Sequence, residues 1–96
     1  MHMTNPVPAR IRCLVSRGMF DNEYAAEISV PGGEPVSLFV DRGLVRIDPL
    51  TNEAMLQVTL VTSNSREGEK TVLLPSEAFE NGSRWLHLPA HEVRPL

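Results

Sequence analysis

The sequence predicts an all-β protein whose single domain is a small antiparallel barrel of six strands. Three observations support this prediction. Six short segments alternate between apolar and polar residues, turns rich in Gly, Pro, Asn and Ser separate them, and hardly any segment has a helical period. Closing such a sheet into a barrel also removes the exposed edges that an open six-stranded sheet would leave.

The first half of the chain contains an N-terminal lead and three expected strands. Residues 1–9 are expected to be disordered or extended, because two prolines exclude a helix, and Met1-His2 has the form of a cloning remnant ahead of Met3. The strands are expected over residues 10–16, 23–30 and 36–40. Gly, Asp and Asn mark the turn after the first strand, and Pro-Gly-Gly joins the second and third strands as a hairpin. The barrel domain is thus expected to span residues 10–96.

The second half restarts the strand pattern after Asp48-Pro49. Alternating apolar residues predict strands over residues 54–62, 69–74 and 84–88. A polar turn is expected at 63–68, and residues 76–79 are expected to form one helical turn with Ser76 as its N-cap. The tail holds a second corner and a final extended segment.

A recurrence 48 positions apart relates the two halves of this 96-residue chain. The stretch VSLFVDRGLVR at 36–46 recurs as WLHLPAHEVR at 85–94, with a strand, a tight corner and then a valine in each copy. The coinciding apolar positions are Leu38 with Leu86, Val40 with Leu88, and Val45 with Val93. The recurrence indicates two copies of one three-stranded unit and predicts that Leu38 and Leu86 occupy equivalent buried positions.

Composition limits the classes of function. The net charge of −3 divides into −1 for residues 1–48 and −2 for residues 49–96, so neither half is a basic module for binding phosphate backbones. One cysteine, Cys13, excludes an intramolecular disulfide, and no apolar run approaches the ~18 residues that cross a bilayer. With no signal-peptide pattern either, we expect a cytoplasmic protein without a membrane partner.

No motif predicts catalysis. His87 and His91 have the spacing of two metal ligands on a helix, but Pro89 between them breaks the helix that this spacing requires. No nucleophile motif or Gly-rich phosphate loop is present, and Cys13 lies in the middle of an expected strand. We therefore expect a non-enzymatic protein with no catalytic residues, no cofactor and no metal.

The strand, single-turn corner and valine that end each half resemble the last strands of an SH3-like barrel. Residues 13–28 also resemble the KOW motif of SH3-like domains associated with ribosomes and RNA polymerase, with Gly18, Phe20 and the small Ala26 at matching positions. The later glycine of that motif is replaced by Asn22 or Glu23, and its basic surroundings are absent. The resemblance implies an SH3-like fold and a nucleic-acid- or ribosome-associated role.

Three residues do not fit a plain barrel. Strand alternation predicts that Phe39, Trp85 and His87 face outward, where they are either covered by the chain's own loops or serve as binding anchors. These three residues form the candidate interaction surface for a protein partner or a second copy in a homodimer. The alternative function, nucleic-acid binding, would use Arg10, Arg12, Arg42 and Arg46 as contacts.

Overall fold

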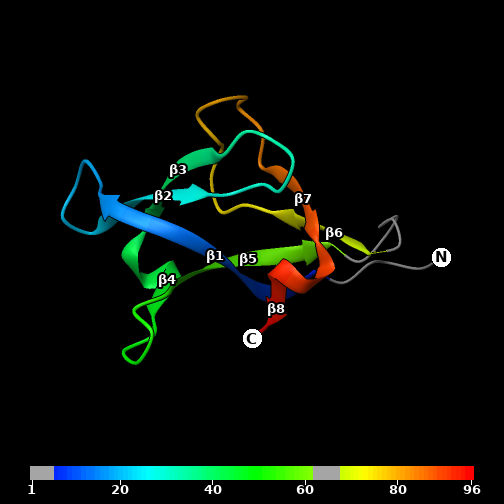
Figure 1. Ribbon diagram of the computed structural model, residues 1–96. Helices are drawn as coiled ribbons and strands as arrows, with labels where there is room; N and C mark the ends of the chain where they lie inside the picture. The colour runs from blue at the N-terminus through cyan, green and yellow to red at the C-terminus, as the bar shows by residue number, and fades with distance from the viewer. Residues whose placement is uncertain (1–5, 62–67) are drawn as a thin grey trace.

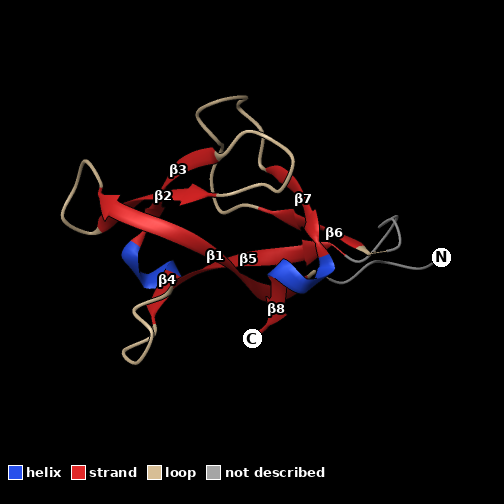
Figure 2. Ribbon diagram, in the orientation of Figure 1, coloured by secondary structure: helices blue, strands red, loops and turns tan. Residues whose placement is uncertain are grey.

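A computed structural model describes residues 6–61 and 68–96 of the protein and shows one antiparallel sheet curled into a half-barrel (Figures 1 and 2). The strands are β1 (Val7–Arg17), β2 (Glu23–Ile28), β3 (Val36–Asp41), β4 (Val45–Ile47), β5 (Ala54–Val61), β6 (Glu69–Leu73), β7 (Trp85–Pro89) and β8 (Val93–Pro95). Two 3-10 turns, η1 (Arg42–Leu44) and η2 (Ala90–Glu92), precede β4 and β8. The predicted all-β, antiparallel, barrel-like fold is confirmed.

Six of the strands form one continuous path in the order β3-β2-β1-β5-β6-β7, and they correspond to the six predicted strands. The short β4 pairs with β5, and β8 pairs with β1. Sequence alternation does not identify these two strands, because three residues are too few to show a period. The SH3-like topology stays a prediction.

The structure differs from these expectations at the start of β1 and in the connection between β6 and β7. β1 begins at Val7 instead of residue 10, because Val7 already pairs with Leu60 in β5. Pro8 is tolerated in this strand because proline can adopt an extended backbone where no N–H donor is needed. The helical turn expected at 76–79 does not form, so that prediction is wrong: the Ser76 hydroxyl donates a hydrogen bond to the Phe39 carbonyl at 2.6 Å instead of capping a helix. The strand end at Thr62 and most of the turn expected at 63–68 lie outside the described residues.

The two halves share one order of elements and matching strand registers. In the central pair, Ile11 of β1 faces Leu56 of β5. Val45 of β4 faces that same Leu56, and Val93 of β8 faces that same Ile11. Both predicted equivalents are buried, Leu38 with 0% and Leu86 with 8% of its surface exposed. The duplication itself stays a prediction.

The connection between β6 and β7 covers the outer edge of β3. The Phe79 N–H donates to the Ser37 carbonyl at 2.8 Å, and the Ser37 N–H donates to a Glu80 carboxylate oxygen at 2.8 Å. Leu74 and Ala78 of the same connection are buried in the core. This connection therefore seals one edge of the half-barrel and protects its backbone groups from pairing with another chain.

Candidate functional site

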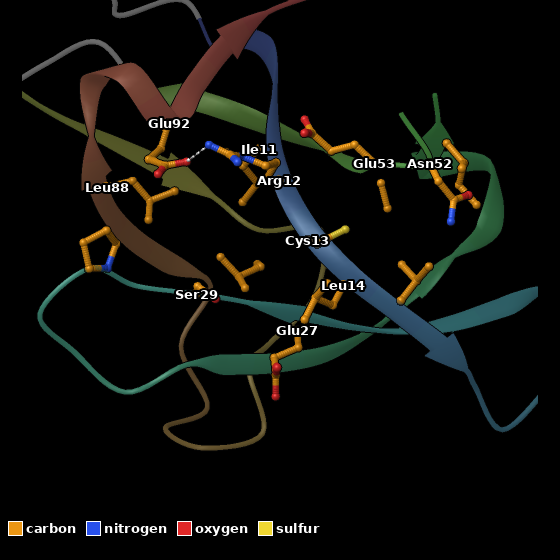
Figure 3. A pocket seen from close by; sticks show the side chains of 15 residues that line it. Ile11, Arg12, Cys13, Leu14, Glu27, Ser29, Asn52, Glu53, Leu88 and Glu92 are labelled. Atoms are coloured by element: carbon orange, nitrogen blue, oxygen red, sulfur yellow. Dashed lines mark hydrogen bonds and ion pairs between the residues drawn. The ribbon is translucent and has the colours of Figure 1, made fainter. Parts of the chain in front are cut away.

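The larger of two grooves on the described residues lies along β1 and has a volume of about 630 Å³ (Figure 3). Its floor is apolar and includes Cys13 and Val15 of β1 and Ile28 of β2, and the exposed Ile47 of β4 lines one side. Its rim carries polar side chains from both sides of β1. Binding grooves for other molecules commonly combine an apolar floor with a few polar groups in this way.

The groove arises because β1 extends beyond the end of its partner β5. The β1–β5 pairing stops at Cys13 opposite Ala54, whereas the β1–β2 pairing runs over residues 14–17. Before Ala54 the chain turns away in a tight hairpin, in which the Asp48 N–H donates to the Glu53 carbonyl at 2.9 Å. Residues 14–17 thus have β2 on one edge and, among the described residues, no strand on the other.

Exposed apolar side chains gather on the two hairpins beside this groove. The hairpins are β1–β2, with its turn at 18–22, and β4–β5, with its turn at 48–53, and the antiparallel register of β1 and β5 places both turns at the same end of the sheet (Figure 1). They carry five of the nine exposed large hydrophobic side chains of the described residues: Leu14, Met19, Phe20, Ile47 and Leu50. We call these five residues and the groove between them the two-hairpin face. Clustering of this kind marks an interaction surface more often than single scattered residues do.

The rim of the groove has an excess of negative charge. Glu27, Glu53 and Glu92 supply three carboxylates, and Arg12 supplies the one cation of the lining. The Arg12 guanidinium donates to Glu92 at 3.4 Å across one side of β1, as the dashed line in Figure 3 shows. Glu53 lies 3.9 Å from Arg94. Two of the three carboxylates therefore lie against arginines, Glu92 against Arg12 and Glu53 against Arg94.

Cys13 contributes to the groove as an apolar group. Burial raises the pKa of its thiol from 9.0 to about 11, because the low-polarity surroundings disfavour the thiolate. The thiol is neutral at physiological pH and is therefore a poor nucleophile.

The structure places the predicted surface residues on the two terminal strands of the six-strand path. Phe39 lies on β3 and is half-buried, because the ring of Phe79 packs edge-on against it with centroids 4.8 Å apart. Trp85 and His87 lie at the other end of the path on β7 and are exposed, Trp85 to 55%. The His87 ring also forms a 2.8 Å hydrogen bond with the Thr71 hydroxyl on the neighbouring strand.

Three of the four predicted arginine contacts lie on the outer face of one four-stranded region. Arg10 and Arg12 are on β1, and Arg46 is on β4. Arg94, which the sequence reasoning did not include, joins them because β8 pairs it directly opposite Arg10. Arg42 lies elsewhere, in η1, with its guanidinium 4.4 Å above the Tyr24 ring.

A second groove of about 370 Å³ runs between three of these arginines, Arg10, Arg46 and Arg94. Asp48 and Glu53 also line it. Two like charges lie directly opposite each other on neighbouring strands in the pair Arg10 and Arg94, which disfavours the pairing, and Glu53 compensates part of this charge at 3.9 Å from Arg94. Because three arginines line one groove, this arginine face is the second candidate site.

The described residues contain no cluster of three or more side chains that could hold a metal ion. His91 approaches its neighbour Glu92 at 3.7 Å, and His87 contacts Thr71 on the adjacent strand. The two histidines are thus engaged on different elements, β7 and η2.

Comparisons with protein-family models, with curated proteins and with solved structures gave no match to this chain. In the part of the chain that the structure describes, no helix has the length and apolar character needed to cross a bilayer.

Proposed function

We propose that the protein is a non-catalytic interaction module that binds another protein through the two-hairpin face. One observation carries this proposal: exposed apolar side chains on two neighbouring hairpins flank the larger groove. Leu14 is 68%, Phe20 65% and Leu50 94% exposed, so covering them with a partner would remove a large apolar area from water. The proposal also includes an SH3-like architecture, an internal duplication and a cytoplasmic location.

The test compares the proteins retained by the immobilised full chain and by surface variants. Leu14→Ser and Leu50→Ser remove exposed apolar contacts and leave the buried core intact. Val7→Ser is the matched control, because Val7 is 42% exposed at the opposite end of β1. A partner identified by mass spectrometry is then purified and its affinity for each chain is measured by calorimetry. We expect Val7→Ser to bind as the wild type does and the hairpin variants to bind at least tenfold more weakly. Equal affinity for all four chains would contradict the proposal.

A second copy of the chain is the alternative protein partner, with Trp85 and His87 on β7 as the exposed part of the sequence-derived surface. Phe39 contributes less exposed area to such a contact because Phe79 packs on it. Light scattering over a range of concentrations tests self-association. A dimer that the substitution Trp85→Ser dissociates would support this arrangement, and a monomer at high concentration would contradict it.

Nucleic-acid binding is the second candidate function, and the arginine face favours it. Arg10, Arg46 and Arg94 line one groove, and Arg12 lies beside Arg10 on the same outer face of β1. The test is retention on heparin, which should fall steeply between low and moderate salt as phosphate contacts release counterions. Arg10→Gln and Arg94→Gln should shorten retention, and Arg42→Gln is the matched control because Arg42 lies outside this face. A chain that heparin fails to retain at low salt would contradict nucleic-acid binding.

A further inference from the structure

We propose that a second copy of this chain occupies the two-hairpin face, with the free edges of residues 14–17 in the two copies paired across a twofold axis at Ser16. This inference rests on the proposed protein-binding function and names the partner and the register of the contact. Three observations carry it together: the unpaired backbone groups of this edge, the apolar turn beside the groove, and the exposed apolar area.

The backbone of residues 14–17 sets the register. The Gly18 N–H donates to the Glu23 carbonyl at 3.3 Å, so the groups of Gly18 point toward β2. Neighbouring residues of a strand point their N–H and C=O groups to opposite edges, so Val15 and Arg17 point to the free edge. Among the described residues, no hydrogen bond reaches these groups there. Each copy therefore offers two donors and two acceptors along one short edge.

A twofold axis at Ser16 matches these groups completely. Val15 of each copy then lies opposite Arg17 of the other, and the two pairs make four main-chain hydrogen bonds. An axis at Val15 would instead place Arg17 opposite Cys13 of the other copy, and Cys13 already pairs with Ala54 of β5. The edge is thus complementary to a second copy of itself.

The same register places an apolar turn of each copy beside the groove of the other. Gly18 of one copy lies opposite Leu14 of the other, where the absence of a side chain on glycine leaves room for the exposed leucine (Figure 3). Met19 and Phe20 come next, are 71% and 65% exposed, and continue past the end of the β1–β5 pairing, where Ile47 lines the groove. A second copy therefore supplies apolar side chains to the groove.

The exposed apolar area is close to what a stable dimer needs. A large hydrophobic residue presents roughly 200 Å² when fully exposed, so the exposed fractions of the five apolar residues of this face amount to about 700 Å² per copy. Stable, specific interfaces bury about 800 Å² per partner, and the paired backbone adds to the apolar part. A twofold contact uses this surface twice, once from each copy.

Arg17 gives the contact a characteristic dependence on salt. It is the one charged residue in the segment 14–17, and the Arg17 side chains of the two copies lie at diagonal positions on the same face of the paired strands. Salt screens the repulsion between these guanidinium groups and leaves the main-chain hydrogen bonds and the apolar burial in place. Added salt should therefore strengthen the dimer, whereas it would weaken a contact held by ion pairs.

The first experiment measures the dimer dissociation constant of the full chain by sedimentation equilibrium. Arg17→Pro removes an N–H that faces the free edge and keeps the hydrogen bonds to β2. Because two of the four intermolecular hydrogen bonds are lost, we expect the dissociation constant to rise about tenfold. Arg17→Ala is the matched control, since it retains the N–H and should dimerise at least as tightly as the wild type. Circular dichroism verifies that both variants fold.

A second variant tests the apolar turn without altering the backbone of β1. Phe20→Ser should also raise the dissociation constant about tenfold, because the phenyl ring leaves the interface. Trp85→Ser is its control, since Trp85 is 55% exposed on β7, outside the two-hairpin face, and this variant should dimerise as the wild type does. In a mixture of labelled and unlabelled copies, intermolecular NOEs should connect the Phe20 ring to Ile47.

Each contrary outcome identifies which proposal fails. A monomer at the highest soluble concentration, a dimer that salt or Trp85→Ser dissociates, or intermolecular NOEs confined to β7 would overturn the inference. Equal dissociation constants for Arg17→Pro and Arg17→Ala would overturn the pairing of the two edges. The purified partner's sensitivity to Leu14→Ser and Leu50→Ser tests the proposed function separately, so binding of a different protein can stand where the dimer fails.

Discussion

The two core leucines at matching places in the half-barrel should be about equally important for stability. Leu38 on β3 is 0% exposed and faces Ala26 on β2, and Leu86 on β7 is 8% exposed and faces Val72 on β6. Replacing a buried leucine by alanine removes its transfer free energy and leaves a cavity, which together cost about 2–5 kcal/mol. We expect Leu38→Ala to lie near the middle of this range or above it, because no part of its side chain is in contact with solvent.

A loss of about 3 kcal/mol is a large fraction of the ~5–15 kcal/mol that stabilise a domain of this size. It should lower the melting temperature by about 12–24 °C, at roughly 4–8 °C per kcal/mol. Urea denaturation, monitored by circular dichroism, would measure the free energy of unfolding of both variants. Leu50→Ala is the matched control, since Leu50 is 94% exposed and its truncation should change the free energy of unfolding by less than about 0.5 kcal/mol. If Leu38→Ala or Leu86→Ala unfolded at the wild-type midpoint, the claim that both leucines are buried in the shared core of the curled sheet would be wrong.

Three smaller predictions concern single side chains. Cys13 should react with iodoacetamide at pH 8 about a hundredfold more slowly in the native chain than in guanidinium, because burial raises the pKa of its thiol from 9.0 to about 11, and equal rates would contradict this shift. The neutral thiol's contribution to stability is complete below about pH 9 and is lost as the pH rises through 11. The hydrogen bond from the Ser37 N–H lowers the pKa of Glu80 below 4.5, so the stabilisation from this contact is present above pH 4.5 and is lost as the pH falls through the lowered pKa. A Ser37 amide resonance that titrates at or above pH 4.5 would refute the lowered pKa. Ser76→Ala should cost about 1 kcal/mol in urea denaturation, because the Phe39 carbonyl loses its donor, and an unchanged midpoint would count against this hydrogen bond.

Much of the sheet could be predicted from sequence, because alternation and turn residues are local signals. Each of the six predicted strands overlaps a strand of the main path, and both predicted corners contain a 3-10 turn. In the first corner the Asp41 carboxylate accepts a hydrogen bond from the Gly43 N–H at 2.8 Å, as expected for Asp in a turn. The partners of β4 and β8 could not be predicted, since they depend on how the halves pair.

The groove depends on a tertiary register and was therefore missed. Its position follows from Cys13 facing Ala54 at the end of the β1–β5 pairing, and no local pattern specifies that register. Local signals did exist, because Leu14 lies on the otherwise polar face of its strand and Met19-Phe20 is an apolar pair within a turn. Arg94 was missed for the same reason as the groove, since only the pairing of β8 with β1 brings it opposite Arg10.

The central claim, that the two-hairpin face binds a partner protein, is tested most directly by an NMR titration. The ¹⁵N-labelled full chain is titrated with the purified partner, and the amide shifts are mapped onto the structure. We predict the largest shifts at residues 14–20 and 47–53, with little change at Trp85 and His87 on β7. Shifts confined to β7, or to Arg10, Arg46 and Arg94 on the arginine face, would contradict the claim.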